Sequence, residues 1–213
     1  MRKATRAVAA ALGLLGGIAG LEHGYFEILQ GSTQPASLMF PSMGPPCAPQ
    51  IAWSACEPAM TLLPNLLVTG ILTVLLGLLI MLWSAAFVQR KNGGGILILQ
   101  SVLQLLLGGG FFPPLIGILG GVAGTQINKP LGERPAGGLV RLAAKLWPWP
   151  LAILVVWLLA QFPVGYFFND FLKSIIGYAL VLIVLLLPLS IYTGYAHDAL
   201  NPMEAPPTPA TGK

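Results

Sequence analysis

The chain has 213 residues, of which 55% are hydrophobic and only 8% are charged, with a formal net charge of +4 and a mean hydropathy of +0.79. These values exclude a soluble enzyme and are typical of integral membrane proteins. Nucleic-acid binding has no support, because the positive residues flank apolar segments, where membrane topology explains them. We therefore expect an all-α, polytopic integral membrane protein that is embedded in a lipid bilayer.

Four segments are long enough to cross a bilayer as single helices, which takes about 20 mostly apolar residues. They cover residues 7–29, 62–88, 146–167 and 174–195. The first also resembles a secretory signal peptide. Its apolar residues continue to Leu29, beyond the usual length of such a signal, which favours an uncleaved span. The sequence predicts one transmembrane domain over residues 1–197.

A fifth apolar segment, residues 95–125, is too long for one straight crossing, since it would measure roughly 46 Å against a bilayer core of about 30 Å. Three glycines and two prolines interrupt it, namely Gly108, Gly109, Gly110, Pro113 and Pro114. Glycine is flexible and proline lacks a backbone N–H, so we expect the helix to break there. The sequence predicts a broken helical hairpin of residues 96–107 and 115–125, which makes five to six membrane segments in all.

The lysines and arginines predict the topology, because they accumulate on the cytoplasmic side of membrane proteins. If the hairpin returns to the side from which it entered, ten of the eleven Lys and Arg residues lie on one side and only Lys173 lies on the other. A single crossing would leave no bias. We therefore expect both termini in the cytoplasm of a prokaryotic cell, with residues 198–213 as a disordered tail.

The loop of residues 30–61 lies outside the cell in this topology and contains both cysteines, Cys47 and Cys56. An oxidising exterior permits a disulfide between them, and we expect it to be structural. A redox role would favour the Cys-x-x-Cys spacing, which the chain lacks. No stretch outside the membrane is long enough for a separate catalytic domain.

Ionisable residues inside the first span are the candidate functional site. His23 and Glu27 are four residues apart and share one helix face. Counted along the helices, Asn65 and Thr69 of the second span lie at the same depths as Glu27 and His23. Glu57 in the preceding loop could reach this level from above. The candidate proton- or cation-binding residues in the outer half of the membrane are Glu22, His23, Glu27, Glu57, Asn65 and Thr69.

Three interpretations of this cluster remain open. The side chains could hydrogen-bond one another and join the helices without a ligand. They could bind a proton or a cation, as intramembrane ionisable groups often do. They could also hold a metal ion for catalysis, although one histidine with carboxylates is a sparse ligand set.

The functions that follow are a small non-enzymatic transporter or channel-like protein, an accessory subunit of a larger membrane complex, and a membrane-embedded metalloenzyme. No cofactor is predicted, and a metal ion belongs only to the third function. A partner, if there is one, is another membrane protein or a second copy of this chain. The Walker, G-x-S-x-G and H-E-x-x-H motifs are all missing from the sequence.

Overall fold

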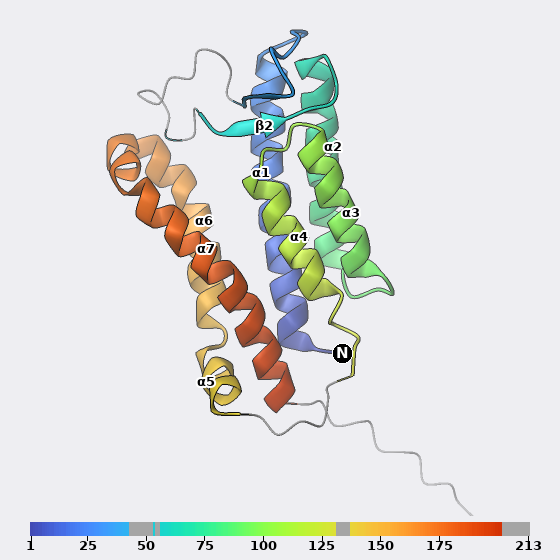
Figure 1. Ribbon diagram of the computed structural model, residues 1–213, viewed down its shortest axis with the longest axis vertical. Coiled ribbons are helices and arrows are strands. Elements are labelled where there is room, and N and C mark those ends of the chain that lie inside the picture. Colours follow the sequence, from blue (N-terminus) through green and yellow to red (C-terminus); the bar gives the residue numbers. More distant parts are fainter. Residues whose placement is uncertain (43–52, 54–55, 131–136, 202–213) are drawn as a thin grey trace, which may run out of the picture.

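The computed structural model describes residues 1–42, 53, 56–130 and 137–201. Within these ranges the chain is helical apart from two short strands (Figure 1). In chain order the elements are α1 (Lys3–Leu29), β1 (Met39–Pro41), β2 (Pro58–Met60), α2 (Leu66–Ala86), α3 (Gly93–Leu106), α4 (Phe112–Gly124), α5 (Gly138–Leu146), α6 (Trp149–Phe167) and α7 (Asn169–Leu200).

Four of these helices, α1, α2, α6 and α7, are long and apolar enough to cross a membrane. Helices α3 and α4 are apolar but shorter. This composition and these lengths are consistent with an integral membrane protein. The amphipathic α5 packs against α7 through Ala143, Ala144 and Ala196, at the end of the bundle that carries the N-terminus (Figure 1).

Helix α1 is the centre of the bundle and packs against α2, α4 and α7. Its contact with α2 depends on glycines in both helices. A methyl group on Gly24 would lie 2.8 Å from the carbonyl oxygen of Gly70, and one on Gly17 would lie 2.8 Å from that of Gly77. Small residues at such positions let two helix backbones approach closely, which is the usual way that membrane helices associate.

Helices α3 and α4 form a hairpin that starts and ends at the N-terminal end of the bundle (Figure 1). Residues 107–111 connect them, so Gly108, Gly109 and Gly110 lie in the connection. Pro113 and Pro114, which we expected in the break, instead lie in the first turn of α4. Proline fits there because the first amides of a helix have no intrahelical partner.

Other helix boundaries also differ from the predicted ones. Helix α2 begins at Leu66 rather than residue 62, because the Asn65 side chain accepts a hydrogen bond from the Val68 amide at 3.2 Å and caps the helix. Helix α6 begins at Trp149, after the separate helix α5. Helix α7 continues to Leu200, so the first residues of the predicted tail are helical, and residues 202–213 lie outside the described residues.

The N-terminal end of α1 is joined to the last turn of α7 by a buried carboxylate. Asp198 accepts hydrogen bonds from the amide of Ala4 at 3.0 Å, the amide of Thr5 at 2.7 Å and the hydroxyl of Thr5 at 2.7 Å. Both amides belong to the first turn of α1, where a helix cannot satisfy its own donors. Arg2 lies over the ring of Tyr195, 4.6 Å from its centroid, and adds a cation–π contact.

Positive charge is concentrated at this same end of the bundle (Figure 1). Of the Lys and Arg residues in the described ranges, only Lys173, near the start of α7, lies at the opposite end. The others are Arg2, Lys3, Arg6, Arg90, Lys91, Lys129, Arg141 and Lys145. The bundle therefore has one strongly basic end.

Candidate functional site

The site begins with an ion pair between α1 and the segment before β2. His23 Nε2 lies 3.1 Å from Glu57 Oε2, and the two side chains are 5% and 33% exposed. Glu57 is held there because β2 pairs with β1, and the amide of Ser42 donates to the Glu57 carbonyl at 3.0 Å. The pair thus joins a buried imidazole to a partly exposed carboxylate.

Glu27 lies one helical turn beyond His23 and is fully buried. Among the described residues, no hydrogen-bond partner reaches either carboxylate oxygen. The Nδ1 atom of His23 is likewise buried without a partner in the same part of the chain. Two adjacent ionisable side chains on one face of α1 are therefore enclosed with incomplete hydrogen bonding, which is uncommon in folded proteins.

The connection between α3 and α4 covers this face of α1. A methyl group on Gly108 would overlap both carboxylate oxygens of Glu27, and one on Gly110 would overlap the imidazole of His23. These two glycines also have φ angles of 101° and 74°, which side-chain-bearing residues rarely adopt. Glycine is thus required at both positions, by the backbone conformation and by the proximity of the ionisable groups.

The connection is held in place by polar contacts from three directions. The Thr73 hydroxyl of α2 donates to the carbonyl of Leu107, and the amide of Leu62 donates to that of Leu106 at 3.1 Å. On the other side the Gln104 side chain donates to the Gly16 carbonyl of α1 at 3.2 Å. Backbone freed from helical bonding inside a membrane protein must find such partners.

Two of the predicted site residues lie elsewhere. Asn65 caps α2 and donates to the Ser32 hydroxyl at 2.8 Å, so its amide is used in the loop rather than at Glu27. Thr69 is buried, and its hydroxyl is 3.0 Å from that of Thr61. The stripe on α2 therefore supports the loop and the α3–α4 connection, and within the described part of the chain it makes no hydrogen bond to the ionisable residues of α1.

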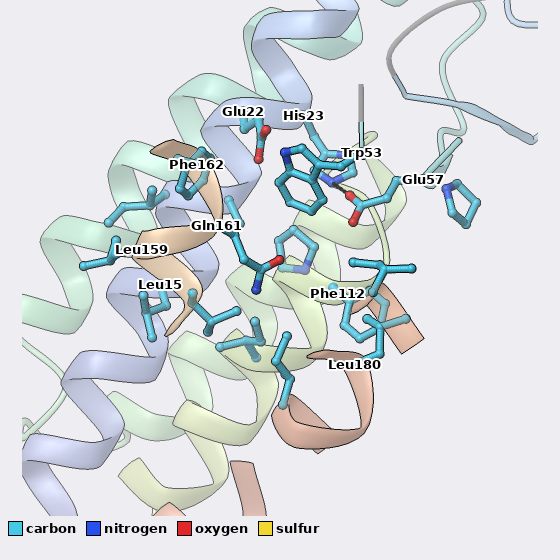
Figure 2. Close-up of a pocket in the computed structure, with 18 of the residues that line it drawn as sticks. Leu15, Glu22, His23, Trp53, Glu57, Phe112, Leu159, Gln161, Phe162 and Leu180 are labelled. Atoms are coloured by element: carbon cyan, nitrogen blue, oxygen red, sulfur yellow. Dashed lines mark ion pairs between the residues drawn. The ribbon is translucent and has the colours of Figure 1, made fainter. Parts of the chain in front are cut away.

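Glu22 points away from Glu27 and lines a cavity of about 350 Å³ together with His23 and Glu57. The cavity lies between α1 and α4 on one side and α6 and α7 on the other (Figure 2). Most of its wall is apolar, with polar groups from Glu22, His23, Glu57 and Gln161. Glu27 is not part of this wall. The candidate residues thus divide into a cavity-lining group and one enclosed carboxylate.

Three residues that form part of the site, two of them polar and one aromatic, were not predicted from the sequence. Gln161 is the one strongly polar side chain of α6, a signal that could have identified it. Gln104 follows Gln100 by four residues in the apolar helix α3, which is a similar signal. Trp53 packs against Gly165 of α6 and lines the cavity from the chain between α1 and α2. Nothing in the loop sequence indicated that contact.

The predicted disulfide stays a prediction, because Cys47 lies outside the described residues, whereas Cys56 lines the cavity. Within the ranges that the structure describes, no three His, Cys, Asp or Glu side chains converge closely enough to hold a metal ion. The chain matches no known family model, and no curated protein and no solved structure is significantly similar to it. The functional assignment therefore rests on the geometry of these residues.

Proposed function

We propose that the protein is a small, non-enzymatic membrane transporter or channel-like protein that binds a proton or a cation at Glu22, His23, Glu27 and Glu57. In this proposal the cluster lies in the outer half of a prokaryotic plasma membrane and both termini are cytoplasmic. The observation that carries the proposal is the enclosed Glu27 carboxylate, which has no hydrogen-bond partner among the described residues.

An ionised carboxylate in an apolar surrounding costs several kcal/mol unless hydrogen bonds or an opposite charge compensate it. If Glu27 served only to join helices, its oxygens would accept bonds from a neighbouring helix, as interhelical polar groups do. The described residues supply no such donor. Compensation by a bound proton or cation is therefore the better explanation, and it agrees with the usual role of ionisable groups within membranes.

The broken hairpin gives the proposal independent support. Non-helical backbone at membrane depth is tolerated where it is buried in protein or lines a cavity, and in transporters it commonly accompanies an ion site. Here the non-helical residues of the α3–α4 connection contact the two unsatisfied side chains, His23 and Glu27. The sequence break and the ionisable cluster, distant in the chain, thus belong to one site.

The charge distribution supports the orientation. Eight of the nine Lys and Arg residues in the described ranges lie at the N-terminal end of the bundle, and that end is cytoplasmic under the positive-inside rule. The His23–Glu57 pair is near the other end. The exposed aromatic rings of Tyr166, Phe167 and Phe168 at the α6–α7 turn are typical of the second membrane interface.

The proposal is tested by flux measurements on the full chain in liposomes. A pH-sensitive dye inside the vesicles reports proton movement, and imposed Na⁺ or K⁺ gradients show whether a cation moves with it. We expect wild-type protein to give flux above empty liposomes, and Glu27→Gln to reduce it at least tenfold while protein yield and the melting temperature are retained.

The control is Asp170→Asn, which removes an exposed carboxylate that pairs with Lys173 at 2.7 Å and does not line the cavity. We expect this variant to keep full flux. Flux in Glu27→Gln equal to that of wild type, or no wild-type flux for any of the three ions, would contradict the proposal.

A further inference from the structure

The cavity beside Glu22 has two chemically different ends (Figure 2). We infer that it binds an amphipathic molecule with an ammonium head and a compact apolar body. This inference rests on the proposed function for the location of the site and adds the class of molecule that the site accepts.

The apolar end is formed by side chains of α1, α4 and α7, among them Leu15, Ile116, Leu180 and Ile183. A volume of about 350 Å³ lies within the roughly 300–1,000 Å³ of sites for small molecules. Such sites are mostly apolar and carry a few polar groups that orient the ligand. The apolar end therefore suits the compact body of a ligand, which gains free energy by leaving water.

The other end has more acidic than basic side chains. Two carboxylates, Glu22 and Glu57, line it with a single imidazole, His23. Even a protonated His23 can balance only Glu57, its partner at 3.1 Å, so an ionised Glu22 is left without a balancing charge within the cavity wall. The Trp53 ring lies beside His23 and Glu57 in Figure 2. An indole face next to carboxylates is a favourable place for an ammonium group.

Gln161 is an independent indication that a ligand enters this space. It is only 6% exposed, and its Nε2 atom finds no hydrogen-bond partner among the described residues. Figure 2 shows its carboxamide pointing into the cavity, between the polar and the apolar end. A buried amide without a partner costs about 1–3 kcal/mol. A polar atom of the ligand next to its head group would satisfy this amide.

The test uses two probes with the same apolar cage, 1-adamantylammonium and the neutral 1-adamantanol. The full chain is placed in phosphatidylglycerol nanodiscs, which have no ammonium head groups, and binding of each radiolabelled probe is measured after subtraction of empty nanodiscs. We expect saturable binding of the ammonium probe with a Kd at least tenfold lower than that of the alcohol.

Two variants separate the ends of the cavity. In Glu22→Gln, the Kd of the ammonium probe is expected to rise at least tenfold, and the Kd of the alcohol to stay within twofold of the wild-type value. Retained binding of the alcohol shows that this variant is folded. Ile183→Trp fills the apolar end and is expected to abolish binding of both probes. Leu180→Trp repeats that test at a second position, and Asp170→Asn is expected to bind both probes like wild type.

Equal affinity for the two probes, or ammonium binding that survives in Glu22→Gln or in both tryptophan variants, would overturn the inference. The outcome is separable from that of the flux experiment. Binding as expected without any ion flux leaves the inference standing and removes the transport proposal. Flux that depends on Glu27 without binding of the ammonium probe does the reverse.

Discussion

Two buried carboxylates lie toward opposite ends of the bundle, and their surroundings differ completely. Asp198, on α7, accepts three hydrogen bonds from Ala4 and Thr5 at the start of α1. Glu27, near the end of α1, accepts none from the described residues and rests against the backbone of Gly108. Burial alone therefore does not reveal what an acidic side chain contributes to a helical bundle.

The difference lies in what compensates each carboxylate. The amides that Asp198 binds would otherwise be unsatisfied donors of a helix N-terminus, so this contact benefits both partners and stabilises the fold. Glu27 offers no comparable gain to its neighbours. A carboxylate that lacks compensation and is nevertheless covered by Gly108, a residue with a positive φ angle, is better explained by function than by stability.

The largest effect is expected from removal of Asp198. Asp198→Ala leaves the donors of Ala4 and Thr5 without an acceptor, and we expect the free energy of unfolding to fall by about 3 kcal/mol. Unfolding in mixed micelles measures it. Asp198→Asn keeps one acceptor oxygen and should lose less. A loss below about 1 kcal/mol in the alanine variant would show that the contact is not a structural anchor.

A smaller loss of stability is expected when Gly108, which contacts Glu27, is replaced. Gly108→Ala forces a side chain into a φ of 101° and against Glu27, and we expect a cost of about 2 kcal/mol. Gly95→Ala, in α3 with open space around it, is the control and should be neutral or slightly stabilising.

Combining Gly108→Ala with Glu27→Ala identifies the source of that cost. If the overlap with Glu27 contributes, the double variant should recover about 1 kcal/mol relative to the sum of the single ones. Strict additivity would mean that the backbone conformation alone restricts residue 108.

A smaller effect, and of opposite sign, is expected when Glu27 itself is replaced. Glu27→Met keeps an unbranched side chain of similar length and removes the uncompensated carboxylate, so we expect the free energy of unfolding to rise by about 1 kcal/mol. Ion flux should be lost in the same variant. A variant destabilised by more than 1 kcal/mol would place Glu27 with Asp198 as a structural residue.

Composition and segment length were sufficient to predict an all-helical chain with four apolar helices of membrane-spanning length, because such long apolar stretches have few other uses. The local glycine and proline signals also predicted a break in the fifth segment. They did not predict that α4 starts at Phe112, since proline both interrupts a helix and fits its first turn. The capping role of Asn65 was not predicted, because its four-residue spacing from Thr69 also fits a polar stripe within the helix.

The site was predicted only in part, for a reason of distance along the chain. The pattern of α1 brings His23 and Glu27 to one face, and it is visible in the sequence. The residues that cover this face come from the α3–α4 connection, and no local pattern links position 27 to position 108. Residue depth along the two helices instead pairs Glu27 with Asn65, because equal depth does not specify which residue of a neighbouring helix faces Glu27.

The Asp198 anchor also fixes one end of a helix that lines the cavity. Helix α7 is 32 residues long, is tied to α1 at its last turn and shares the apolar core with α1 through Ile183, Leu186 and Leu187. At 1.5 Å per residue, the helix extends roughly 44 Å from Asp198 to its first residue. A rotation of α7 by about 5° about its anchored end would move its first residue by about 4 Å. A small rotation of α7 about its anchored last turn would therefore change the width of the cavity beside Glu22.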